Sequence, residues 1–113
     1  MRAFMRAKIH KATVTESNLN YIGSITIDQT LMDLAGLAEN EKVLVVSNTS
    51  GARLETYVIT WAKDSWVICM NGAGSHLIKT GEEIIIMAFE YTDTPSKPTC
   101  ILVDPKNVFV QYL

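Results

Sequence analysis

The chain is divided into many short β-prone segments by turn residues, and only one segment has a clear helical pattern. The predicted strands cover residues 3–15, 24–27, 42–46, 53–60, 66–70, 82–91, 100–103 and 108–112. A turn at residues 48–51 predicts a hairpin between the third and fourth of these. Short strands at regular spacing with little helix favour a small all-β barrel or sandwich.

One helix is expected over residues 29–34. Asp28 can cap its N-terminus and Gly36 can stop it. A glycine-rich stretch at residues 71–74 predicts a flexible loop, and residues 75–79 predict one helical turn.

Length and charge exclude several classes of protein. The 113 residues make a single domain, 1–113, and 48% of them are hydrophobic, which is enough for a core. The formal net charge is -2 with no basic stripe, so no nucleic-acid partner is expected. The longest apolar run, residues 84–89, is too short to cross a membrane, and the charged N-terminus does not resemble a signal peptide. We therefore expect a cytoplasmic protein.

Metal binding and disulfide bonding are poorly supported by the sequence. His10 and His76 are the only histidines and have no partner at ligand spacing, so no metal is expected. Cys69 and Cys100 both lie in apolar runs, which predicts buried thiols that act as small hydrophobic side chains.

Two Gly–Ser dipeptides are present, Gly23-Ser24 and Gly74-Ser75. A serine hydroxyl can attack the carbonyl just before it and convert the amide to an ester. Elimination and hydrolysis of that ester leave a pyruvoyl group on the new N-terminus. Both dipeptides can equally be ordinary turns, and chance alone supplies roughly one or none in a chain of this size. The surrounding residues must decide.

Polar residues fall on defined faces of two predicted strands. Lys8 and His10 share one face of the first strand, because side chains alternate with a period of two. Arg53 and Tyr57 share one face of a later strand, and Thr56 lies on the other. Taken singly, the charged residues are typical of solvent-exposed strand positions, and Tyr57 is typical of a ring at the edge of the core.

Taken in order, these residues resemble the pyruvoyl-dependent aspartate 1-decarboxylase family. The resemblance rests on Lys8-x-His10, Tyr21-x-Gly23-Ser24, Ile27-Asp28, Ala35-Gly36, Glu39-Asn40-Glu41, Arg53-x-x-Thr56-Tyr57 and Asn71-Gly72-Ala73. It covers residues 8–89. Ile22 stands where some members have an acidic residue, and Gly74 stands where alanine is common. The sequence after Tyr91 matches weakly.

The resemblance implies a small six-stranded double-psi β-barrel with short helices, assembled as a homotetramer with sites between subunits. It implies self-cleavage between Gly23 and Ser24 into a short chain, 1–23, and a longer chain, 24–113. The cofactor would be a pyruvoyl group made from Ser24. The implied reaction is removal of the α-carboxylate of L-aspartate to give β-alanine and CO2, for pantothenate and coenzyme A synthesis.

The resemblance also implies roles for individual residues. The pyruvoyl made from Ser24 would form a Schiff base with the substrate amine, Tyr57 would donate a proton, and Thr56 would serve chain processing. The substrate would be bound by Lys8, Arg53, Asn71, Gly72 and Ala73. His10 would lie at the edge of the site, and Tyr21 and Thr56 are further candidate site residues.

The physical properties of several residues fit these roles. The planar guanidinium of Arg53 can bind a carboxylate through two hydrogen bonds. Gly23 has no Cβ, so its peptide can take strained geometries and admit the Ser24 hydroxyl. Gly74-Ser75 has no such surroundings and is expected to stay intact.

Two alternatives remain open at this point. One is a non-catalytic β-barrel that binds a ligand or partner and uses Gly23-Ser24 as a turn. The other is the same family fold with slow maturation that needs an accessory protein. Preference for aspartate over glutamate also stays open, because one methylene of pocket length is worth only about 1–3 kcal/mol.

Overall fold

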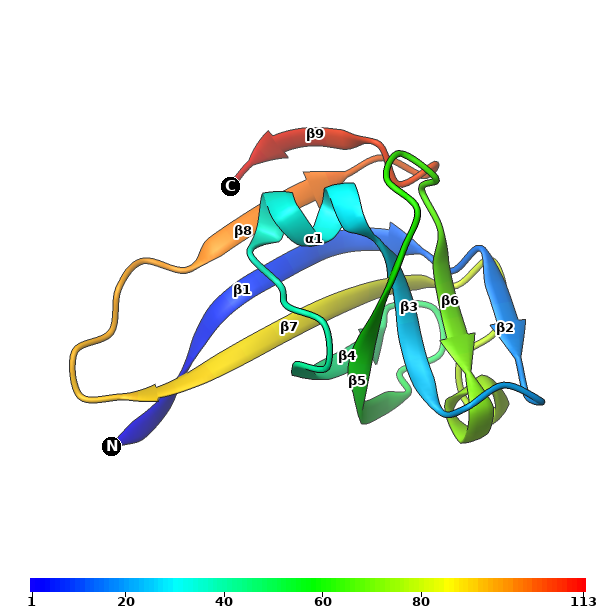
Figure 1. Cartoon of the computed structure of the whole chain (residues 1–113), viewed down its shortest axis with the longest axis horizontal. Coiled ribbons are helices and arrows are strands. Elements are labelled where there is room, and N and C mark those ends of the chain that lie inside the picture. The colour runs from blue at the N-terminus through cyan, green and yellow to red at the C-terminus, as the bar shows by residue number, and fades with distance from the viewer.

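A computed structural model describes all residues, 1–113, and contains nine strands, one α-helix and one 3-10 helix (Figure 1). The elements are β1 (Arg2–Thr13), β2 (Glu16–Asn18), β3 (Ser24–Asp28), α1 (Gln29–Ala35), β4 (Lys42–Ser47), β5 (Arg53–Trp61), β6 (Ile68–Asn71), η1 (Gly72–His76), β7 (Glu83–Thr92), β8 (Thr99–Val103) and β9 (Phe109–Tyr112). Neither helix has the length and apolar character needed to cross a lipid bilayer.

Seven of the strands form a closed, six-stranded ring, in which β1 and β2 together count as one strand. The strands are hydrogen-bonded in the order β2-β6-β3-β5-β4-β7-β1-β8-β9. Only Val14 and Thr15 separate β1 from β2. The Val14 N–H donates to the Glu82 carbonyl at 3.0 Å, and the Thr15 N–H donates to the Ile68 carbonyl at 2.7 Å. Because β1 and β2 thus act as one bent strand, they close the ring with β6, β3, β5, β4 and β7.

This ring confirms the predicted mainly β, six-stranded double-psi barrel with short helices. Within it, β3 runs parallel to β5 and β2 runs parallel to β6. The expected hairpin is the antiparallel pair β4–β5. The strands β8 and β9 extend the sheet beyond β1, outside the ring.

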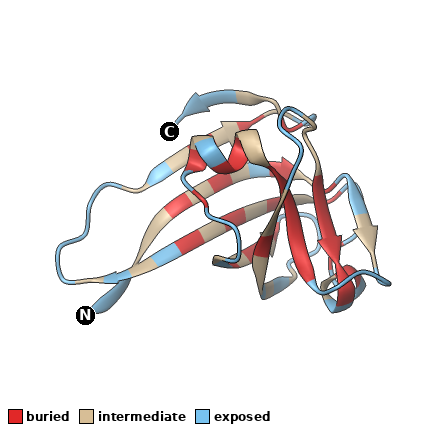
Figure 2. Cartoon of the chain, in the orientation of Figure 1, coloured by how far each residue is buried: buried red, intermediate tan, exposed pale blue.

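The core fills the inside of the ring. Alternate residues of the strands, including Ile9, Ile25, Val45, Val58 and Ile86, have no exposed surface. Figure 2 shows this alternation along β1 and β7 and the burial of β3 and β6. Neighbouring side chains on these strands point out of the barrel, so a functional site must form on its outer surface or at its ends.

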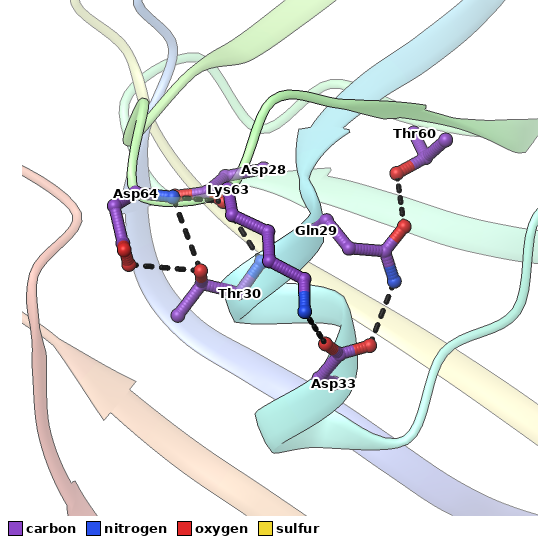
Figure 3. A network of polar contacts seen from close by, with 7 residues as sticks. All are labelled: Asp28, Gln29, Thr30, Asp33, Thr60, Lys63 and Asp64. Atoms are coloured by element: carbon purple, nitrogen blue, oxygen red, sulfur yellow. Dashed lines mark hydrogen bonds and ion pairs between the residues drawn. The ribbon is translucent and has the colours of Figure 1, made fainter.

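Helix α1 begins where the sequence predicts and ends one residue later than expected, at Ala35, before Gly36. The Asp28 side chain accepts a hydrogen bond from the Thr30 N–H at 2.8 Å, and Gly36 ends the helix at a φ of 79°. The Asp28 carboxylate also accepts from the N–H groups of Asp64, at 3.0 Å, and Trp66, at 2.8 Å. Figure 3 shows how the loop that contains Asp64 and the first turn of α1 are joined by polar contacts. This second role of Asp28 was not predicted. With residues 64–66 bound to it, β6 starts at Ile68 instead of residue 66.

The predicted flexible loop at residues 71–74 and the helical turn at residues 75–79 are both misplaced. Asn71 ends β6, and the 3-10 helix η1 spans Gly72–His76. The Ser75 hydroxyl donates to the Gly72 carbonyl at 2.7 Å, and the Leu77 N–H donates to the Gly74 carbonyl at 3.0 Å. These bonds hold the glycines in one conformation, so their intrinsic freedom does not make the segment a loop.

Candidate active site

Ser24 is the first residue of β3 and is only 1% exposed. Its hydroxyl donates a hydrogen bond back to the Ile22 carbonyl at 3.2 Å. It also accepts one from the Asn71 side-chain amide at 3.0 Å. The segment before it, residues 19–23, is exposed. The serine thus marks the point where an exposed loop enters the barrel, and its oxygen is held near its own preceding chain.

Asn71 reaches Ser24 because β6 runs antiparallel to β3, with Asn71 opposite Ser24. Its Nδ2 also donates to Thr26 Oγ1 at 2.8 Å, and its Oδ1 accepts from Cys69 Sγ at 3.0 Å. Burial, and then the negative charge of Glu16, raise the pKa of the Cys69 thiol to about 11. Because the thiol stays protonated at neutral pH, it can donate this bond and fix which side of the amide faces Ser24.

A groove of about 410 Å³ lies beside this cluster. It is lined by Gly23, Leu54, Glu55, Thr56, Tyr57, Asn71, Ala73, Gly74 and Leu77. The parallel pairing of β3 with β5 starts at Ile25 opposite Val58, so the same register places Ser24 next to Tyr57. The part of β5 before that point has no β3 strand beside it. Thr56 and Tyr57 therefore both border the groove, although they point to opposite faces of the strand.

A second hollow has a volume of about 250 Å³. Its lining includes Tyr21, Thr26, Trp61 and Cys69. Asn71 borders both spaces. The predicted residue Tyr21 is therefore near the cluster, although its ring is about half exposed.

The expectation that Gly23 needs the freedom of a residue without a Cβ is not supported by the structure. The φ of this residue lies outside the left-handed region, and an added Cβ would meet no atom within 4 Å. Gly72 differs, since it has a φ of +66° and its Cα packs against the backbone of Gly23. The position that requires a bare Cα is thus residue 72.

Lys8 and His10 lie on the outer face of β1, because their neighbours Ala7 and Ile9 fill the core. Neither lines either hollow. The His10 Nδ1 atom is buried without a hydrogen-bond partner. Burial, followed by the nearby charges of Lys8 and Lys11, lowers the pKa of His10, so the ring is neutral at neutral pH.

Arg53 is the exposed first residue of β5 and also lines neither hollow. It is two residues from Glu55, which borders the larger groove and forms an ion pair with Lys42 at 2.5 Å. A single chain therefore gathers the predicted cleavage and proton-donor residues, but it does not gather the predicted cations with them.

Sequence reasoning missed Thr26 and Cys69 as partners of Asn71. The period of two along β3 puts Thr26 on the face of Ser24, and this was a usable signal. Cys69 could not be found in this way, because its position opposite Thr26 depends on the pairing of β3 with β6. No group of three His, Cys, Asp or Glu side chains comes together as a metal site.

The family model described as aspartate decarboxylase matches residues 1–110. An aspartate 1-decarboxylase of Bacillus cereus (strain ATCC 10987 / NRS 248) is 47% identical over 116 residues, covering 99% of this chain and 91% of that protein. An aspartate 1-decarboxylase of Clostridium botulinum (strain Alaska E43 / Type E3) is 52% identical over 107 residues, covering 91% of this chain and 86% of that protein. With a barrel of the expected type and similarity over nearly its whole length, the chain belongs to the aspartate decarboxylase family.

Proposed function

We propose that this protein is a proenzyme that cuts its own chain between Gly23 and Ser24 and then decarboxylates L-aspartate. The products are β-alanine, for pantothenate and coenzyme A synthesis, and CO2. Family membership supports the reaction. The observation that carries the cleavage is the Ser24 hydroxyl, which is held against its own upstream chain by Ile22 and Asn71 at the edge of a groove.

The cleavage starts from the Ser24 hydroxyl. Its oxygen attacks the Gly23 carbonyl carbon, the amide C–N bond breaks, and the freed nitrogen takes up the hydroxyl proton, which leaves an ester. Loss of the Ser24 α-proton then breaks the Cβ–Oγ bond and releases the carboxylate of Gly23. Water hydrolyses the remaining dehydroalanine to the pyruvoyl group and ammonia. Every atom comes from the chain and from water.

Neighbouring side chains supply what the first step needs. A tetrahedral oxyanion forms on the Gly23 carbonyl and requires a hydrogen-bond donor. Thr56, which borders the groove together with Gly23, is assigned this processing role. Asn71 donates to the attacking oxygen and so fixes its position.

The residues around Ser24 also suit the mature site. A pyruvoyl group made from Ser24 supplies an electron sink for the carbanion left by decarboxylation. Tyr57, next to Ser24 in the strand register, is the proposed proton donor to that carbon. Asn71, Gly72 and Ala73 are the proposed substrate contacts through their amide groups, and Asn71 and Ala73 line the groove. Since Ser24 is buried in the uncut chain, access for aspartate depends on the release of Gly23.

The substrate is a small dianion, and the cations assigned to it lie apart from Ser24 within one chain. Lys8 and Arg53 line neither hollow beside Asn71. We therefore assign them to sites completed between subunits of a homotetramer, with His10 at the edge. Large apolar side chains around the cleavage loop are exposed in the single chain, as an interface requires: Leu19, Tyr21, Ile22, Trp61 and Leu77.

The proposed compartment is the cytoplasm. Both cysteines are free thiols, which agrees with a reducing environment.

Denaturing mass spectrometry after warm incubation tests the proposal. Two fragments divided between Gly23 and Ser24 are expected, the longer one lighter by one ammonia than a peptide that starts with serine. Release of CO2 and β-alanine from aspartate should rise with the cleaved fraction, and glutamate serves as the competing substrate. Intact chain that binds ligands equally well with Ser24→Ala would favour a binding barrel. Cleavage only after addition of a cell extract would indicate an accessory maturation protein.

A mixing experiment tests the shared site. Lys8→Ala chains keep Ser24, and Ser24→Ala chains keep Lys8, so each alone should be inactive. When the two are co-expressed, some interfaces combine an intact Lys8 with an intact Ser24, and activity should return. Failure to recover activity from co-purified mixed oligomers would contradict a site shared between subunits.

A further inference from the structure

The Cα of Gly72 lies against the backbone of the proposed cleavage site. A Cβ added at this position would lie 2.6 Å from Gly23 Cα, 2.8 Å from Gly23 N and 3.2 Å from the Tyr21 carbonyl oxygen. All three atoms belong to the backbone, so no side-chain rotation can relieve the overlap. A methyl group at residue 72 would have to displace the chain at residue 23.

No other glycine of the chain has this combination of conformation and contact. Gly51 and Gly81 share its left-handed conformation, with φ of +78° and +90°, but an added Cβ would meet nothing within 4 Å at either site. At Gly74 the nearest atom, at 2.9 Å, is the Sδ of the flexible Met70 side chain. The conformation of Gly72 is therefore common in this chain, whereas its contact is not.

The surface that Gly72 presents is held in place from both sides. Asn71, just before it, is paired with Ser24 and hydrogen-bonded to its hydroxyl. The Gly72 carbonyl accepts the Ser75 hydroxyl within η1. The start of η1 is thus fixed relative to the attacking oxygen, and the backbone of residue 23 rests against it.

We propose that Gly72 is a positioning residue for chain cleavage. Because it has no side chain, the Gly23 backbone can pack against its Cα and lie within reach of the Ser24 hydroxyl. This inference rests on the proposed self-cleavage and adds a role to the substrate contact assigned to Gly72 above. Real Cβ contacts are not found below 3.0 Å, so a side chain at residue 72 moves Gly23 by several tenths of an ångström or more. A misplacement of about 1 Å costs roughly 100-fold in a reaction that needs a near-attack geometry.

The test compares Gly72→Ala with Gly51→Ala, which places the same residue at a similar positive φ without the contact. The cleaved fraction is followed over time by denaturing mass spectrometry, and folding is checked by circular dichroism and thermal unfolding. Both variants should lose thermal stability, because both force alanine into the left-handed region. Gly72→Ala should lose at least as much as Gly51→Ala, since only residue 72 also has the backbone overlap. Only Gly72→Ala should cleave about 100-fold more slowly than the wild type.

Hydroxylamine identifies which step is slowed. It cleaves an ester between residues 23 and 24 and leaves a serine-started chain, so it reveals any ester that accumulates. If Gly72 positions Gly23 for the acyl shift, the ester should not accumulate in Gly72→Ala. Hydroxylamine should then not speed up cleavage of this variant. Rapid cleavage of that variant by hydroxylamine would show that the shift proceeds normally and would overturn the proposal.

The remaining outcomes are also decisive. A folded Gly72→Ala chain that cleaves at the wild-type rate overturns the proposal. If this variant does not fold, Gly72→Asn and Gly51→Asn replace the pair, because asparagine adopts the left-handed region more readily and keeps the added Cβ. Misfolding of both Gly72 variants alone would show a requirement for folding in place of positioning. An intact wild-type chain would instead refute the proposed self-cleavage itself.

Discussion

The same dipeptide, Gly–Ser, occurs in two regions of the barrel with opposite surroundings. Gly23-Ser24 joins an exposed loop to a buried strand, and the Ser24 hydroxyl turns back to the Ile22 carbonyl. Gly74-Ser75 lies inside the 3-10 helix η1, where the Ser75 hydroxyl donates to the Gly72 carbonyl. The Gly74 carbonyl also accepts the N–H groups of Leu77 and Ile78, both at 3.0 Å.

The two dipeptides have the same residues but different hydrogen bonds, so the proposed difference in reactivity between them would come from those bonds. At Ser75 the hydroxyl closes a turn, and the carbonyl that it would attack is part of a helix. At Ser24 the hydroxyl accepts a hydrogen bond from the Asn71 side chain beside an open groove. The predictions below test this contrast.

The largest effect is expected from the two serines themselves. Ser24→Ala removes the attacking oxygen, so cleavage and decarboxylation should both be abolished. Ser75→Ala should leave cleavage at Ser24 unchanged and lower the free energy of unfolding by about 1 kcal/mol, the value of one hydrogen bond. Mass spectrometry and urea unfolding measure the two effects. A cut between Gly74 and Ser75 in the wild type or in Ser24→Ala would break the comparison.

Tyr57→Phe should separate the cleavage step from the later chemistry. The variant keeps the ring and loses only the hydroxyl, so the chain should still be cut at Ser24. Turnover of aspartate should fall at least ~100-fold, the usual contribution of a positioned proton donor. Activity per cleaved subunit is the quantity to measure, and an unchanged value would exclude Tyr57 as the donor.

Asn71→Ala should slow cleavage by roughly 10- to 100-fold. The variant loses the hydrogen-bond donor to Ser24 and Thr26, and losing such a buried donor costs about 1–3 kcal/mol of free energy. Asn107→Ala is a matched control. Its side chain is also buried but binds Thr13 and Trp66, away from Ser24. The control should lose stability without losing cleavage rate. Equal slowing in both variants would attribute the effect to folding.

Cys69 tests the orientation of the Asn71 amide with a smaller effect. Cys69→Ala removes the donor to Asn71 Oδ1, and cleavage should slow by about tenfold, which corresponds to one neutral hydrogen bond. Cys69→Ser keeps a donor and should recover most of the rate. Cys100→Ala changes the other thiol, on β8, and should have no effect on cleavage.

The smallest effect concerns Glu82, which holds the chain after η1. Burial opposes ionisation of this carboxyl, but hydrogen bonds from the Ser47 hydroxyl and the Lys79 N–H outweigh it and lower the pKa of Glu82. A lowered folded-state pKa contributes stability above the unfolded value of 4.5, and this is lost as pH falls through the folded value. Thermal unfolding of Glu82→Gln should therefore depend less on pH below 4.5 than that of the wild type.

Much of the fold could be predicted because its signals are local. Asp28 and Gly36 mark the ends of α1 by their own side-chain and backbone chemistry. Alternation of apolar residues marks the strands. Closure of the ring could not be read in this way, because it depends on Thr15 meeting Ile68 across 53 residues.

The candidate site was predicted less completely, for the same reason. Family resemblance identified Ser24, Thr56, Tyr57 and Asn71, and the fold gathers them or their neighbours around one groove. Nothing in the local sequence shows that Gly23 has room for a side chain while Gly72 has none. That distinction arises only when two distant backbone segments touch.

The closed ring has a consequence for the mature protein. Residues 1–23 supply β1 and β2, which pair with β7, β8 and β6 of the remaining chain. After the proposed cleavage this fragment would be retained by strand pairing and core packing without a covalent link, as in a split protein reassembled from two pieces. Unfolding then separates two molecules in place of one, and its midpoint rises with protein concentration. Self-cleavage would thus change the molecularity of folding, so the chain can fold as one molecule only before it matures.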